Sequence, residues 1–193
     1  MSSILKVDQL QDSGGNAIIT SDGSGNITTG TGMGKVLQVV STTKTDTYSE
    51  TISARGTGSD ITGLTATITP TSASSKLLVY ATLNTSRADP LAYANFIIHR
   101  DGSPVLVGDS AGSRLPVTVG GNISPAGGTL IFNTFSFGQV DASSTSSTTF
   151  SLRLENSGSS SSRTFYVNRS GTDTDANYST RTISSIMVME VSA

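Results

Sequence analysis

The chain has 193 residues, of which 13% are charged and none is cysteine, whereas an average globular domain is about 25% charged. Ser and Thr together supply 61 residues, and the formal net charge is −2. A chain without cysteine forms no disulfide or zinc–thiolate site and has no thiol nucleophile. This charge also gives no electrostatic footprint for nucleic acid or an anionic membrane. The composition therefore favours a structural or binding protein over an enzyme.

The first 34 residues differ in composition from the rest. Apolar and polar residues alternate from Ile4 to Leu10, and Gly, Asn, Ser and Thr dominate after that. Lys6 and Asp8 interrupt the apolar run that a secretory signal needs, and no stretch reaches the roughly 20 apolar residues of a membrane span. We therefore expect a protein that is made in a cytosol and stays soluble there.

Two β-branched runs in this region flank Ser21-Asp22-Gly23-Ser24-Gly25, and an Asp-Gly step between such runs predicts a hairpin. So few apolar residues cannot bury a core alone. We therefore predict that residues 1–34 are an extended segment stabilised by identical chains or by a docking surface, and a disordered segment is the alternative. The predicted docking and oligomerisation residues are the apolar ones of the opening stretch: Ile4, Leu5, Val7 and Leu10.

From Lys35 onward, short apolar and β-branched runs alternate with turns rich in Gly, Ser and Asp. Period-two alternation predicts strands, here at 36–40, 64–69, 77–83, 95–100, 105–107, 129–137, 148–155, 163–168 and 182–191. No window has helical spacing, and the frequent Ser, Thr and Gly disfavour helices. Residues 35–193 are therefore predicted to form an all-β head, an antiparallel β-sandwich or jelly roll.

Three local patterns refine this head. Asp101-Gly102-Ser103-Pro104 has the chemistry of a turn between two strands. The final strand is apolar on both faces near its end, which predicts a central place in a sheet or a subunit contact. Most of the six Phe residues lie in strand patterns and are predicted to belong to the core.

No catalytic, cofactor or metal site is predicted. His99 is the single histidine, and without a GxSxG elbow a surface or edge position is the better interpretation than a Ser-His-Asp site. Asp173, Asp175 and Asn177 resemble the start of a calcium loop, but Tyr178 and Ser184 stand where Gly and Glu are needed. The glycines at 30–34 lack the P-loop pattern and are interpreted as a joint between the two regions.

A polar loop from Thr172 to Arg181 is the best binding candidate. Tyr178 lies in it, with Arg169 and Arg181 nearby. A tyrosine offers rigid apolar area and a hydrogen-bonding tip, which suits recognition of sugars or protein surfaces together with arginine. These three residues are the predicted receptor contacts, although a solvated loop without a ligand stays an open alternative.

The opening ILKVDQLQDSGGNAIITSDGSGNIT resembles the N-terminal segments of bacteriophage tail-fibre and fibre-like virion proteins, especially of marine phages. The stretches ITGLTATITPTSASSKLLVYATLN, HRDGSPVLVGD, TTFSLRLEN and ISSIMVMEV are similar to their C-terminal jelly-roll heads. The resemblance covers most of the chain but includes no catalytic motif. It implies a homotrimer in the virion, assembled in the host cytoplasm, with an N-terminal attachment segment and an outward-facing head.

The resemblance leaves the position in the virion open, because the chain has almost no shaft. A short tail fibre or receptor-binding tip is expected, and a capsid decoration (cement) protein or head fibre is the alternative. A polysaccharide hydrolase is disfavoured by the length and by the missing acidic cluster. The expected partners are other copies of the chain, tail or capsid proteins, and a host-surface glycan or outer-membrane protein.

Overall fold

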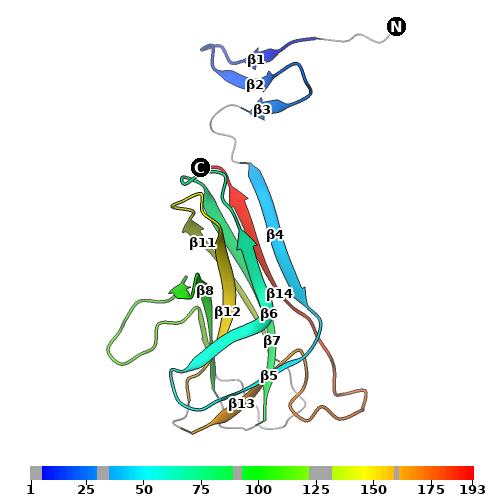
Figure 1. Ribbon diagram of the computed structural model, residues 1–193, viewed down its shortest axis with the longest axis vertical. Coiled ribbons are helices and arrows are strands. Elements are labelled where there is room, and N and C mark those ends of the chain that lie inside the picture. Colours follow the sequence, from blue (N-terminus) through cyan, green and yellow to red (C-terminus); the bar gives the residue numbers. More distant parts are fainter. Residues whose placement is uncertain (1–5, 30–34, 89–92, 122–131, 159–160) are drawn as a thin grey trace. The chain divides into compact units, whose positions relative to one another are not determined.

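The computed structural model describes residues 6–29, 35–88, 93–121, 132–158 and 161–193. It divides into two compact units, Met1–Lys35 and Val36–Ala193, called here the N-terminal sheet and the head. Within the described ranges every regular element is a β-strand (Figure 1). No helix in these ranges is long and apolar enough to cross a membrane.

The N-terminal sheet is a meander of three short antiparallel strands, β1 (Gln9–Gln11), β2 (Ala17–Ser21) and β3 (Ile27–Thr29). The predicted hairpin is confirmed, because β2 and β3 pair on either side of the turn at Asp22. A second turn at Asp12 joins β1 to β2. The described part of this segment is therefore a small sheet instead of the extended chain that we predicted.

The first sheet of the head is antiparallel and has six strands (Figure 1). Its central strand β7 pairs along residues 76–82 with β14 on one edge and with β11 on the other. β14 in turn pairs with β4, so the C-terminal strand is central as predicted. The strands of this sheet are β4 (Val36–Lys44), β5 (Tyr48–Ile52), β7 (Lys76–Arg87), β11 (Phe132–Asp141), β13 (Arg163–Val167) and β14 (Ser184–Val191).

The second sheet has five strands, all antiparallel, with β12 between β6 and β8. β9 and β10 pair with successive parts of the other edge of β8. The strands of this sheet are β6 (Gly58–Ile68), β8 (Ala94–Arg100), β9 (Ser103–Val105), β10 (Val119–Gly121) and β12 (Thr148–Asn156). Near β4 the two sheets are joined by hydrogen bonds that Gln38 and Thr42 donate to carbonyls of β6 and the residue after it.

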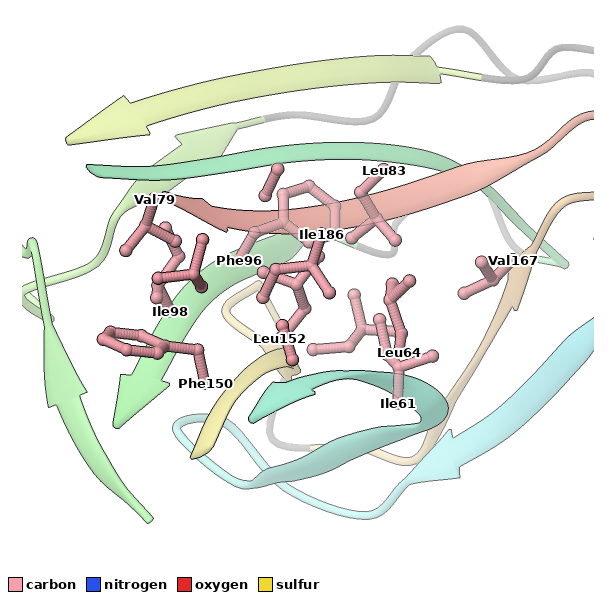
Figure 2. Packing of buried hydrophobic residues seen from close by; sticks show 14 of the residues in the cluster. Ile61, Leu64, Val79, Leu83, Phe96, Ile98, Phe150, Leu152, Val167 and Ile186 are labelled. Carbon is pink, nitrogen blue, oxygen red and sulfur yellow. The ribbon is translucent and has the colours of Figure 1, made fainter. Parts of the chain in front are cut away.

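The two sheets enclose one apolar core (Figure 2). On β7, Leu77, Val79, Ala81 and Leu83 point inward and alternate with half-buried residues, as the period-two pattern predicts. Phe96, Phe150 and Phe165 are also core residues, as predicted. The all-β fold and the antiparallel β-sandwich are thus confirmed.

A β-bulge explains why the sequence pattern of β6 was only partly recognised. Ile61 and Leu64 are both fully buried although they are three residues apart, and the register with β12 shifts between them. Gly63 sits in the bulge with a φ of +80°, a conformation that glycine adopts without strain. Alternation alone therefore predicts this strand only from residue 64 onward, although β6 begins at Gly58.

Several predicted details need correction. The turn after β8 consists of Asp101 and Gly102 alone, both with positive φ, so Ser103 and Pro104 belong to β9. β5 and β10 were not predicted, and the start of the strand predicted at 129–137 lies outside the described residues up to 131. Phe135 and Phe137 do not belong to the core, since they are 64% and 55% exposed.

Candidate functional site

The apolar side of the N-terminal sheet forms an open groove. Cross-strand pairing places Leu10 of β1 beside Ile19 of β2 on one face, and Val7 and Ile27 flank them. The groove has a volume of about 340 Å³. Val7 is 54% and Ile27 is 67% exposed, so this small sheet leaves its apolar face open to solvent.

Two turns of the same design shape this sheet. In each, an Asp carboxylate accepts hydrogen bonds from two backbone N–H groups, those of Gly14 and Asn16 for Asp12, and those of Ser24 and Asn26 for Asp22. The Asn side chain at the end of each turn also donates to the carboxylate. These side-chain and backbone hydrogen bonds hold the pKa of both carboxyl groups below the ordinary value. The turns fix the register that brings the apolar residues onto one face.

The groove contains two of the four predicted docking residues. Val7 and Leu10 line it, while Ile4 and Leu5 lie outside the described residues. Ile19 and Ile27 also line it and were not predicted as docking residues. The predicted hairpin could have identified Ile19 and Ile27, because pairing β2 with β1 and β3 places alternate β-branched residues on one face.

The predicted receptor loop is held together by one carboxylate. Asp173 forms ion pairs with Arg169 at 2.9 Å and with Arg181 at 2.7 Å, and the backbones of the two arginines form an antiparallel bridge. The Arg169 guanidinium also lies 3.9 Å from the ring centroid of Tyr166, a cation–π distance. The structure therefore brings Arg169 and Arg181 together.

Only part of this cluster is available for contacts. Tyr178 and Arg181 are more than half exposed, whereas Arg169 is mostly covered. Asp173 neutralises one of the two positive charges, so the cluster keeps a single net positive charge and one exposed aromatic ring. Such a rim suits a polar ligand with hydroxyl or carboxylate groups. Its role as a receptor contact stays a prediction.

His99 is buried, so the interpretation as a surface or edge residue was wrong. It is 5% exposed and lies on β8, which is paired on both edges. Its Nδ1 is 3.9 Å from Oδ1 of Asp60, and Ser151 donates a 2.7 Å hydrogen bond to the same carboxylate. Burial, opposed by Asp60 and assisted by Arg153, lowers the pKa of His99.

This cluster does not have the geometry of a catalytic triad. In a triad the serine hydroxyl donates to the histidine, and the carboxylate holds the other imidazole nitrogen. Here Ser151 donates its proton to Asp60, and the carboxylate–imidazole distance is too long for a hydrogen bond. The arrangement is that of a polar contact within the sheet, and it gives no support to acyl-transfer chemistry.

The calcium-like sequence at Asp173, Asp175 and Asn177 forms a turn whose first carboxylate is already bound by two arginines. Among the described residues, no group of three or more His, Cys, Asp or Glu side chains could hold a metal ion. The glycines at 30–34, predicted to form a joint, lie outside the described residues.

Comparison with known proteins adds little to these observations. No family model and no curated protein matches the chain. Solved structures with similarity to it include one of infectious bursal disease virus Gt strain (14% identity, TM-score 0.44) and the VP2 subviral particle of that virus (16% identity, TM-score 0.42). The matches cover 87% of this chain but only 43% and 42% of the viral chains. The chain thus spans less than half the length of these structures, and the similarity carries no argument about function.

Proposed function

We propose that this protein is a structural component of a bacteriophage virion. In this proposal it is a short tail fibre or receptor-binding tip that attaches through its N-terminal sheet and presents the β-sandwich head to the host surface. Three copies act together, and the chain is not an enzyme. The observation that carries the proposal is the open apolar groove of the N-terminal sheet, on Val7, Leu10, Ile19 and Ile27. The fibre-like opening sequence supports the same assignment.

The groove needs a partner for a physical reason. Domains shorter than about 40 residues usually depend on disulfides, metals or association. The chain has no cysteine, and the described residues contain no metal-binding cluster. Burial by a partner contributes up to about 1.5–3 kcal/mol for each groove residue. In this proposal, association through this face supplies the stabilisation that so small a sheet needs.

The head contributes host contacts in this proposal. Tyr178 and Arg181 form the exposed rim of the loop, and Arg169 positions Arg181 through Asp173. A host glycan or outer-membrane protein is the expected ligand. Three copies would present three identical rims, so weak contacts would add by avidity.

Electron microscopy of intact particles with a tag-directed gold label tests the location. Label at the tail is the expected result. Label over the capsid would mean that the protein is a decoration protein or head fibre and not a tail fibre. Particles without label would overturn the assignment to the virion.

A matched pair of variants tests the groove. We expect Leu10→Ser combined with Ile27→Ser to lower the number of copies per particle at least about tenfold, since two buried anchors are lost. Ile18→Ser is the control, because alternation places Ile18 on the opposite face of β2 from Ile19. Quantitative immunoblotting of purified particles gives the readout. Equal incorporation of both variants would contradict attachment through the groove.

A further inference from the structure

The outer face of the six-stranded sheet carries a continuous apolar surface. In one row across the sheet, Phe137, Tyr80 and Met187 are direct cross-strand neighbours. The row beside it contains Leu78, Met189 and Val39. Phe135 extends the surface along β11. These seven residues, called here the aromatic face, span β11, β7, β14 and β4.

Two large aromatic residues of β11 face outward, where an isolated head leaves them exposed. Phe135 and Phe137 point to solvent, and the small residues Thr134, Ser136 and Gly138 alternate with them on the other side. Thr134 and Ser136 line a small void beside the core. Fully burying one Phe contributes about 1.5–3 kcal/mol relative to full exposure, and an isolated head, in which Phe135 is 64% and Phe137 is 55% exposed, forgoes more than half of that contribution at both positions.

Side chains of the aromatic face already pack against one another. The rings of Phe137 and Tyr80 pack with centroids 4.6 Å apart, within the range of favourable aromatic pairs. Met187 and Met189 lie beside them on β14, and methionine adapts to irregular partner surfaces. Contiguous apolar patches of several hundred Å² are rare on monomeric proteins and mark interaction sites.

Charge identifies the kind of partner. The cross-strand rows from Phe135 to Val39 contain only apolar, hydroxyl and amide side chains. The charged residues that border this face, Lys76 and Asp141, pair with each other at 2.5 Å at one end. A surface without net charge neither repels nor misaligns an identical surface, so a second copy of this chain can cover it without an unpaired buried charge.

The size of the face is consistent with that partner. A strand spacing of about 4.8 Å and a rise of about 3.4 Å per residue give the outer surface of these four strands a size of about 19 Å by 27 Å between Lys76 and Asn84, with the aromatic face at its centre. Three such surfaces turned toward a three-fold axis bury up to roughly 1,500 Å² in total, which is the size of a specific protein–protein interface.

We propose that the aromatic face is the surface through which copies of this chain associate in the head. Each copy covers Phe135 and Phe137 of another, around the symmetry axis of the oligomer. The inference rests on the homotrimer in the proposed function and deepens it by naming the contact surface. In the oligomer, another copy of the chain would cover Phe135 and Phe137, which are exposed in the isolated head.

Light scattering and sedimentation of the purified full-length protein provide the first test. We expect the wild-type protein to have a mass of about three times the 19.8 kDa of one chain. We expect Phe135→Thr combined with Phe137→Thr to raise the dissociation constant at least about tenfold, as loss of one interface hot spot does. Threonine keeps the strand preference. Leu115→Thr is the control, since Leu115 is an exposed leucine outside the aromatic face.

Site-directed cross-linking gives a second test that does not depend on stability. The chain has no cysteine, so Met187→Cys introduces a single thiol at the centre of the aromatic face. A bismaleimide reagent should then link two copies. Thr65→Cys is the control, because alternation along β6 places Thr65 on the outer face of the other sheet, where it is exposed.

The outcomes separate this inference from the proposed function. Suppose that the wild-type protein and the Phe double variant are both oligomeric and that cross-linking at positions 187 and 65 is equal. The aromatic face is then not the contact surface, and only this inference is overturned. A monomeric wild-type protein overturns both the homotrimer and the inference. If that monomer still enters particles and the Phe variant does not, another virion protein covers the face and the inference fails.

Discussion

Glu190 is a buried carboxylate whose described hydrogen bonds come from neutral donors. It lies on β14 and is fully buried. Gln38 donates to Oε2 at 2.6 Å, and the Thr71 backbone and hydroxyl donate to Oε1 at 2.8 and 2.9 Å. Desolvation raises the pKa of Glu190, but these hydrogen bonds outweigh it and lower the pKa to about 2. The carboxylate thereby fastens the loop after β6 to the six-stranded sheet.

The first prediction concerns this carboxylate. Glu190→Gln should lower the free energy of unfolding at neutral pH by about 1–3 kcal/mol, because the amide NH₂ replaces an acceptor where only donors approach. In the wild-type protein this stabilisation is present above pH 4.5 and is lost as the pH falls toward 2, since the folded pKa lies below the unfolded one. Denaturant unfolding from pH 7 to pH 2 measures both effects. Asp175→Asn, at an exposed carboxylate, is the control, and an equal change in both variants would refute the prediction.

His99 gives the second prediction, which concerns a loss of stability with falling pH that begins near pH 6.5 instead of below pH 4.5. Burial lowers the pKa of its imidazole in the folded protein, whereas the unfolded pKa is near 6.5. As the pH falls below 6.5, the unfolded chain binds a proton that the folded chain does not, so the free energy of unfolding decreases. An NMR titration is unambiguous because the chain has one histidine. A midpoint at or above 6.5 would show that Asp60 outweighs burial.

At the scale of elements, the two Asp turns should control the N-terminal sheet. We predict that Asp12→Ala combined with Asp22→Ala increases amide hydrogen exchange throughout residues 9–29, because both turns lose their carboxylate acceptors. Exchange in the head should stay unchanged, since the two units are separately compact. Asp8→Ala is the control, as its carboxylate belongs to neither turn. Unchanged protection in the double variant would mean that partner burial alone holds the sheet.

Alternation predicts most strands of the head, but it does not always predict which face of a strand meets the core. Leu77 to Leu83 revealed both the strand and its inward face, because apolar and polar residues alternate there without interruption. In β11 the outward-facing Phe135 and Phe137 are larger apolar residues than Val140, which packs against the core, and alternation alone cannot say which face meets the core. The pairing with β7 decides it, and that pairing is long-range. The bulge at Gly63 likewise depends on the partner strand, so the first half of β6 was missed.

The candidate site was predicted in part for the same reason. Val7 and Leu10 were predicted as apolar residues of the opening stretch, whereas Ile19 and Ile27 join them only once three strands pair. Arg169 and Arg181 were selected by composition, and Asp173, which links them, was interpreted as part of an acidic turn. The buried position of His99 could not be seen from its place just before a turn, because burial there comes from strands distant in sequence.

At the scale of the whole molecule, the described residues include two groups of neighbouring exposed apolar side chains, the groove of the N-terminal sheet and the aromatic face of the head. The rest of the chain is rich in hydroxyl side chains and poor in charge. An assembly held by such surfaces depends on removing apolar area from water, and very little on pairing charges. This distinguishes it from complexes in which electrostatic attraction guides association.

The last prediction follows from that difference. Raising NaCl from about 50 mM to about 500 mM should change the dissociation constant of the oligomer less than about threefold, because screening acts on charges that the aromatic face lacks. Sodium sulfate should strengthen association, since its exclusion from protein surfaces favours apolar burial. Sedimentation equilibrium in both salts measures the constants, and the Phe135→Thr/Phe137→Thr variant shows whether the sulfate effect depends on the aromatic face. A loss of affinity greater than about tenfold in NaCl would instead indicate an interface built on ion pairs, and such an interface would have to lie elsewhere on the head.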